Sequence, residues 1–198
     1  MDIDFLLLQR MKRGDENAFD VFVRKYYKEI LNYCNYHCPD TSTAEDLTQE
    51  TFLRFFEKLS DYRYMGKTKN YLYTIAGNLC RDSYKKIRES LLEEQSLEIQ
   101  DCLHPPETDE LLNRLTIKAA LDRLPAELRE VIILYYFQEL KLTEISSTLQ
   151  IGLPLVKYRV KQAENNRSSL IYTTIAAQRT KANASSHHGW KQKLDDNF

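Results

Sequence analysis

Apolar residues recur at intervals of three and four along most of this chain of 198 residues, and this spacing limits its fold more than any other feature. Residues at such intervals gather on one face of an α-helix, whereas a half-buried strand requires strict alternation. No alternating segment competes with this pattern, so the sequence predicts an all-α fold. The clearest stripe comprises Phe19, Phe22, Val23, Tyr26, Tyr27, Ile30, Leu31 and Cys34.

Turn-forming residues separate the expected helices. Gly14 and Asp15 end a first helix, and a turn over residues 39–43 offers Ser or Thr as the cap of the helix that follows the stripe. Pro125 stands at an early helical position, where its missing N–H is tolerated. The later helices are expected over residues 44–59, 70–88, 111–123, 124–135, 143–149 and 154–170.

The distribution of charge indicates how these helices divide into domains. The net charge is only −1, yet residues 91–112 contain seven acidic residues and no basic residue, and they include Pro105 and Pro106. Such a segment is typical of a mostly extended acidic linker, with a helical start at Leu91 and Leu92 as an alternative. We therefore expect two small helical domains, over residues 1–90 and 113–170. Residues 171–198 would form either a frayed tail or an extension that docks on a partner.

Several classes of protein are excluded by the sequence. No apolar run is long enough to cross a membrane and no secretory signal is recognisable, so we expect a cytoplasmic protein without membrane insertion. The five glycines are isolated and form no phosphate-binding loop. Cys34, His37 and Cys38 form one cluster without a partner pair, which cannot build a tetrahedral metal site. We predict no catalytic residue, no metal and no cofactor.

The two helices expected over residues 143–149 and 154–170 carry a nucleic-acid signal. A short turn that contains Gly152 joins them, and the second helix is rich in Lys, Arg, Tyr and Gln. This pattern is typical of a helix-turn-helix, whose second helix enters the major groove. The residues expected to contact the duplex, with bases and phosphates not distinguished, are Pro154, Leu155, Lys157, Tyr158, Arg159, Lys161 and Gln162.

Three blocks of sequence have a specific order. They are AEDLTQETFLRFF over residues 44–56, YLYTIAGNLCRD over 71–82, and LDRLPAELREV over 121–131, with LTEI and VKYRV following over 142–145 and 156–160. In this order they resemble the extracytoplasmic-function group of bacterial sigma factors, over about residues 5–170. The first two blocks are similar to the polymerase-binding and promoter-melting helices of sigma region two, and the rest is similar to region four. Tyr71, where the family often has Trp, and the turn before Val156 depart from the family pattern.

The first block predicts a surface for the polymerase. Its polar residues follow i, i+3, i+4, i+7 spacing, so they share one helical face beside two phenylalanines. The resemblance implies that this face binds the clamp coiled coil of core RNA polymerase. The alternative is a solvated face whose acidic residues stabilise the helix N-terminus. The residues expected to bind the polymerase are Asp46, Gln49, Glu50, Phe52, Leu53 and Phe56.

The loop over residues 60–70 and the helix after it interleave basic and aromatic residues. Proteins hold single strands in this way, because cations follow the phosphates and rings stack on unpaired bases. We expect the loop to cradle a flipped base of the minus-ten element, although several of the tyrosines, Tyr71 above all, could instead belong to the core. The expected contacts are Tyr62, Arg63, Tyr64, Lys67, Lys69, Asn70, Asn78, Arg81, Asp82, Lys85, Lys86 and Arg88.

Together, the resemblance implies a sigma factor that binds core RNA polymerase, melts the minus-ten element and reads the minus-thirty-five element of promoter DNA. The alternatives are a helix-turn-helix regulator that binds DNA without polymerase, and a sigma-like protein that has become an interaction partner. A simple regulator would have no use for the face around Gln49 and Glu50. Sigma factors of this group are often held inactive by an anti-sigma protein, which is therefore a candidate partner.

Overall fold

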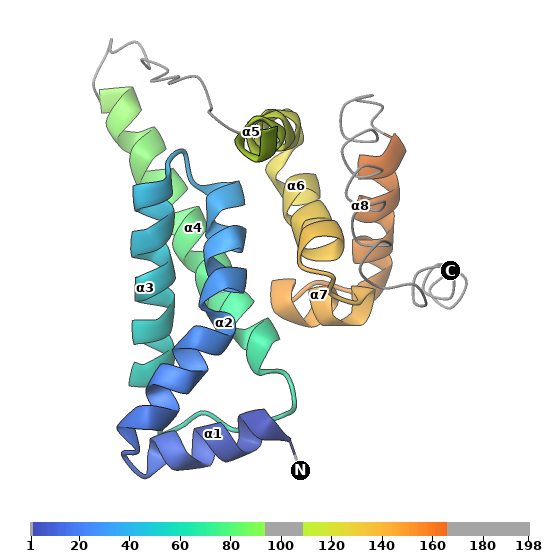
Figure 1. Ribbon diagram of the computed structural model, residues 1–198. Coiled ribbons are helices and arrows are strands. Elements are labelled where there is room, and N and C mark those ends of the chain that lie inside the picture. Colours follow the sequence, from blue (N-terminus) through green and yellow to red (C-terminus); the bar gives the residue numbers. More distant parts are fainter. Residues whose placement is uncertain (1, 94–108, 166–198) are drawn as a thin grey trace. The chain divides into compact units, whose positions relative to one another are not determined.

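The computed structural model describes residues 2–93 and 109–165, and it describes side chains over 2–86 and 116–165. Helices and their connecting turns make up these residues, and neither range contains a strand, which confirms the all-α prediction. The helices form two compact units, consisting mainly of residues 1–100 and of the residues after them (Figure 1). The predicted tail over 171–198 lies outside the described residues.

Four helices build the first unit: α1 (Ile3–Lys12), α2 (Glu16–His37), α3 (Thr41–Glu57) and α4 (Thr68–Glu93). Aspartates begin the first three, because the carboxylates of Asp2, Asp15 and Asp40 each accept a backbone N–H of the first turn. The expectation of Ser or Thr as the cap before α3 is wrong. Asp40 takes this position, with its Oδ1 2.8 Å from Thr43 N.

Aromatic rings fill the centre of the first unit, where α2, α3 and α4 pack against one another (Figure 1). Phe22 of α2 is fully buried and stacks on Phe55 of α3, with ring centroids 4.9 Å apart. Tyr33 of α2 contacts Tyr73 of α4 at 5.2 Å. Each such ring stabilises the unit by about 1.5–3 kcal/mol through burial. Every fourth residue of the predicted stripe is buried, namely Phe22, Tyr26, Ile30 and Cys34.

The second unit contains α5 (Asp109–Asp122), α6 (Ala126–Ile132), the π-helical turn η1 (Ile133–Phe137), α7 (Leu142–Leu149) and α8 (Leu153–Asn165). The turn between α7 and α8 contains Gly152, as expected, and its left-handed residue is Gln150, with φ +55°. Ser146 Oγ donates to the carbonyl of Ile151 at 2.6 Å and closes this turn. Val156 of α8 is fully buried, as expected for the internal contact of a helix pair.

Several helices differ by a few residues from their expected bounds, and two of these differences fall in the expected linker. The helix expected to end near residue 88 continues to Glu93, and α5 begins at Asp109. Both ends of the segment expected to be an extended linker, 91–112, are therefore helical, and its middle lies outside the described residues. Within the described ranges, the search for a helix of the length and apolar character needed to span a membrane finds none.

Candidate functional site

One face of α3 presents a mixture of polar and apolar side chains. Leu53 is the large apolar side chain that this face exposes, to 57 %. Arg54 Nε lies 2.8 Å from Glu50 Oε1, as an i,i+4 pair along the same surface. The residues of this α3 face that are exposed or half-buried are Asp46, Gln49, Glu50, Leu53 and Phe56.

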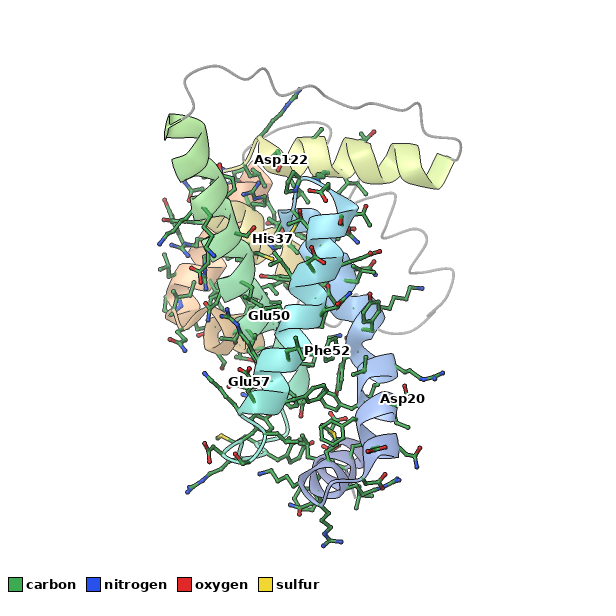
Figure 2. The ribbon with its side chains drawn as sticks, turned by 90° about the vertical axis from the view of Figure 1, so that its left-hand side faces the viewer. Asp20, His37, Glu50, Phe52, Glu57 and Asp122 are labelled. Carbon is green, nitrogen blue, oxygen red and sulfur yellow. The ribbon has the colours of Figure 1, made fainter. Side chains whose placement is uncertain are left out.

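Phe52 is not part of the α3 face, contrary to the sequence expectation. It is 4 % exposed and points toward α2, where its ring contacts Phe22 and Tyr27 (Figure 2). Phe52 lies four residues after Thr48 and three before Phe55, and both of these are fully buried. Helical spacing therefore puts Phe52 on the inner side of α3, where it supports the exposed face from beneath.

In the loop between α3 and α4, the side chains of residues 62–65 alternate between half-buried and exposed. Tyr62 and Tyr64 are half-buried, whereas Arg63 and Met65 are exposed, Met65 to 81 %. The sequence reasoning missed Met65, because it counted only basic and aromatic residues as ligands for nucleic acid. The adjacent Gly66 has a left-handed backbone, with φ +72°.

Tyr62 is held against the unit by other rings. It stacks on Tyr71 with centroids 5.1 Å apart and planes inclined by 22°, and it contacts Phe55 at 5.3 Å. Burial raises the pKa of the Tyr62 hydroxyl. The stacked rings of Tyr62 and Tyr71 thus attach the loop to the first unit. This agrees with the alternative that several of these tyrosines support the fold.

Tyr64 is tied to the start of the chain. Its hydroxyl donates to the carboxylate of Asp2, and its ring lies 5.8 Å from that of Phe5. This hydrogen bond is the main reason that the pKa of Tyr64 rises to about 12 and that the pKa of Asp2 falls below its usual value. The two inward tyrosines of the loop are therefore both engaged within the protein.

At the start of α4, too, some of the residues expected to contact DNA are exposed and others are engaged within the protein. Lys67 is exposed, whereas Lys69 Nζ lies 2.8 Å from Glu29 Oε2 and 5.8 Å above the ring of Tyr73. Asn70 is 8 % exposed, contrary to expectation, and its amide Nδ2 has no hydrogen-bond partner among the described residues. Lys67 is thus the member of this group whose side chain is free to approach a ligand in solvent.

Further along α4, the predicted residues share one exposed face. Their positions follow i, i+3, i+4, i+7, i+8 spacing, and the Arg81 guanidinium donates to the side-chain oxygen of Asn78. Tyr84, which the sequence reasoning did not include, is 57 % exposed beside them. The side chain of Arg88 lies outside the described residues. The exposed members of this α4 face are Asn78, Arg81, Asp82, Lys85 and Lys86.

The helix α8 also has one exposed face, with spacing i, i+1, i+4, i+7, i+8. Its apolar members are prominent, since Leu155 is 41 % and Tyr158 is 61 % exposed. Lys157 and Arg159, both expected to contact DNA, are only half-exposed, and Arg159 forms an ion pair with Glu127 of α6. The residues of this α8 face are Pro154, Leu155, Tyr158, Lys161 and Gln162.

Three buried cysteines meet inside the first unit. Cys80 of α4 forms hydrogen bonds with the thiols of Cys34 and Cys38, which lie at the end of α2. These thiol contacts and burial raise the pKa of Cys80. The sequence reasoning grouped Cys34 and Cys38 but did not place Cys80 with them. Within the described ranges, no group of three His, Cys, Asp or Glu residues is arranged to hold a metal ion.

Both units correspond to known protein families. Residues 22–89 match the family Sigma-70 region 2, and residues 114–165 match the family Sigma-70, region 4. The chain is 30 % identical over 167 residues to the ECF RNA polymerase sigma factor SigW of Bacillus subtilis. This match covers 77 % of this chain and 88 % of SigW. It is 27 % identical to the RNA polymerase sigma-H factor of Pseudomonas aeruginosa, over 81 % of this chain and 89 % of that protein.

A solved structure has a related fold. The sigma factor RpoE of Bartonella quintana, crystallised with the anti-sigma factor NepR, matches this chain with a TM-score of 0.66 and 22 % sequence identity. The match covers 78 % of this chain and 96 % of RpoE. The exposed faces of α3, α4 and α8 all lie within the matched family regions.

Proposed function

Because this chain belongs to the sigma-70 family, within its extracytoplasmic-function group, we propose a separate surface for each step by which it starts transcription. The chain is a sigma factor that binds core RNA polymerase and directs promoter-specific transcription initiation. The division of its helices into inward and outward faces supports the assignment of these steps to residues. The steps are assigned to three surfaces: the α3 face, the α3–α4 loop with the α4 face, and the α8 face.

The α3 face is the proposed contact with the polymerase. Leu53 supplies an exposed apolar centre, and Asp46, Gln49 and Glu50 surround it with acceptors and a neutral amide. An apolar centre with a polar rim is the usual anatomy of a protein interface. The acidic rim fits a basic helical partner, because charge complementarity steers association and fixes its register. Phe52 contributes from beneath, by holding α3 on α2.

The α3–α4 loop and the α4 face are the proposed contacts with the melted minus-ten element. Arg63, Met65 and Lys67 point outward from the loop, so two cations can follow phosphates while the Met65 side chain contacts an unstacked base. Met is suited to this because its side chain is unbranched and polarisable. The α4 face extends the basic surface, and its Asn78 can read a base edge as well as contact the backbone.

The α8 face is the proposed reader of the minus-thirty-five duplex. Gln162 can form a bidentate contact with adenine, and Lys161 can bind guanine or phosphate. Leu155 and Tyr158 lie toward the N-terminal end of α8, which enters the groove first in this class of motif. An exposed leucine there fits the methyl group of thymine, which is the apolar feature of the major groove.

Reconstitution with core RNA polymerase tests the α3 assignment. The double variant Gln49→Ala, Leu53→Ala should weaken binding to core by at least about tenfold, since truncation of central interface residues commonly costs more than 1 kcal/mol each. Arg24→Ala is the matched control, because Arg24 is exposed on α2 and pairs with Asp20 outside this face. Unchanged core affinity of the double variant would contradict the assignment, whatever its effect on promoter binding.

Two further points follow from this proposal. The chain would act by binding and would catalyse no covalent step, in the cytoplasm where the polymerase and the promoter are found. An anti-sigma protein is a candidate second partner, as the fold of RpoE is known in complex with one. A simple repressor is the weaker alternative, because it gives no role to the exposed Leu53.

A further inference from the structure

The first helix of the chain is attached to the α3–α4 loop by contacts that the three proposed surfaces do not use. Lys12, at the end of α1, places its Nζ 3.1 Å from the carbonyl oxygen of Ser60 and 2.8 Å from that of Tyr62. At the other end of α1, Asp2 accepts a hydrogen bond from the Tyr64 hydroxyl. Both ends of one short helix therefore hold the same loop.

Lys12 holds backbone carbonyls that lie just beyond the end of α3. A cation near the C-terminal end of a helix is favourable, because the last carbonyl groups point there without a partner in the helix. Beyond the end of α3, the backbone N–H of Tyr62 bonds to the carbonyl of Lys58, at 2.9 Å. The Lys12 ammonium donates to the carbonyls of Ser60 and Tyr62 and so holds the path by which the chain leaves α3.

The side chains of this held segment differ in exposure. Tyr62, whose carbonyl Lys12 holds, packs on Tyr71 and Phe55, and the next residue, Arg63, is exposed. Tyr64, which Asp2 holds, is half-buried, and the next residue, Met65, is exposed. The helix α1 itself is fastened to α2, because Asp4 accepts hydrogen bonds from Lys25 and from the Tyr26 hydroxyl.

We propose that α1 is a positioning element for promoter melting: Lys12 and Asp2 hold the α3–α4 loop in the conformation that receives an unpaired base. This inference rests on the proposed role of the loop in binding the minus-ten element. Lys12 is a positioning residue that acts through the backbone of the loop, and it needs no contact with DNA. A loop held in its bound conformation loses less entropy on binding, and that gain is lost when the loop is released.

The test uses holoenzyme reconstituted from the full chain and core polymerase. Its ligand is a single-stranded non-template minus-ten oligonucleotide from a promoter at which this holoenzyme initiates. Each nucleotide of the oligonucleotide is replaced in turn by an abasic site. With the wild-type chain, one position should show an affinity loss of roughly five- to tenfold or more, as expected for one stacked base.

The informative variants differ in the ability to bond the two carbonyls. Lys12→Met should reduce the abasic penalty to less than about twofold, because a disordered loop no longer distinguishes a base from its absence. Lys12→Arg should keep the penalty, since a guanidinium can donate to both carbonyls. Arg13→Met is the matched control, because it removes the same charge from the neighbouring exposed residue and should keep the penalty.

The outcomes separate the two proposals. An abasic penalty that survives in Lys12→Met would overturn the positioning role and leave the loop assignment intact. A wild-type chain with no sensitive position would overturn the loop assignment and the positioning role together. A smaller penalty in Lys12→Met and Arg13→Met alike would identify lost charge as the cause, which also overturns the positioning role. Core affinity, measured in parallel, should be the same in all four proteins.

Discussion

Arg159 Nη2 in α8 lies 2.7 Å from Glu127 Oε2 in α6, so the arginine of the recognition helix is directed at its own domain. The Arg159 side chain is 18 % exposed, whereas that of Glu127 is 72 % exposed. The pair links α8 to α6, and the proposed contacts with DNA therefore fall to other residues of the α8 face, such as Lys161 and Gln162. A pair this exposed contributes less than about 1 kcal/mol to the stability of the domain.

The first prediction separates Arg159 from Lys161 by the salt dependence of promoter binding. Lys161→Ala should lower the slope of log K against log salt by about 1, as expected for one lost phosphate contact. Arg159→Ala should leave the slope near that of the wild-type holoenzyme, because its charge is already paired with Glu127. Filter-binding or fluorescence titrations between low and moderate salt measure this. A full unit lost in Arg159→Ala would show that the pair opens on DNA.

The second prediction concerns Leu155 and thymine. Replacing individual thymines of the minus-thirty-five element by deoxyuridine removes only a methyl group, which should weaken binding about fourfold at a contacted position, or about 0.8 kcal/mol for one buried carbon. In Leu155→Ala the same replacement should have almost no effect. Tyr158→Ala serves as the comparison, since it alters the same face and should keep the sensitivity to deoxyuridine. Equal sensitivity in Leu155→Ala and wild type would refute the contact.

The third prediction is a pH dependence of the bond between Tyr64 and Asp2. The pKa of Tyr64 is raised to about 12 in the folded protein, so this bond stabilises the fold fully below pH 10 and is lost as the pH rises toward 12. The Asp2 pKa is lowered, so the same bond is also lost as the pH falls below the usual range of a carboxyl. Absorbance titration of tyrosinate should lose one late-titrating group in Tyr64→Phe, and the same group should shift toward pH 10 in Asp2→Asn.

The fourth prediction concerns the thiol cluster. Cys80 should react with iodoacetamide much more slowly in the native protein than in denaturant at pH 8, because its thiol is buried and hydrogen-bonded to Cys34 and Cys38. Peptide mapping by mass spectrometry measures alkylation at this residue. Cys34→Ser should leave the cluster incomplete and destabilise the first unit, since a hydroxyl replaces a buried thiol. Rapid alkylation of native Cys80 would contradict the buried placement.

The sequence was sufficient for the helices and for the family, because both depend on patterns that repeat along one element. The stripe through Phe22, Tyr26 and Ile30 has helical spacing that does not depend on the rest of the chain. The block around Gln49 likewise lies within one helix. Which residue of α3 points inward follows from the same spacing once Thr48 and Phe55 are known to be buried.

The sequence was insufficient where the answer depends on a contact distant along the chain. Arg159 is basic and lies in a recognition helix, yet Glu127 is 32 residues away. Tyr64 is an aromatic residue in a basic loop, but its partner, Asp2, is 62 residues away. Cys80 joins Cys34 and Cys38 only because α4 packs on α2. Composition and spacing carry no information about such pairs, so Arg159 and Tyr64 were assigned to DNA and Cys80 was assigned no partner.

The alternation in the α3–α4 loop has a consequence for how sigma factors of this kind can diverge. Tyr62 and Tyr64 hold the loop, whereas Arg63, Met65 and Lys67 face solvent and make no contact on which the loop depends for its shape. Mutations at the outward positions can therefore accumulate without a folding defect. Under the proposed role of the loop, exchange of these three side chains would change promoter preference, while Tyr62 and Tyr64 would keep the loop in place.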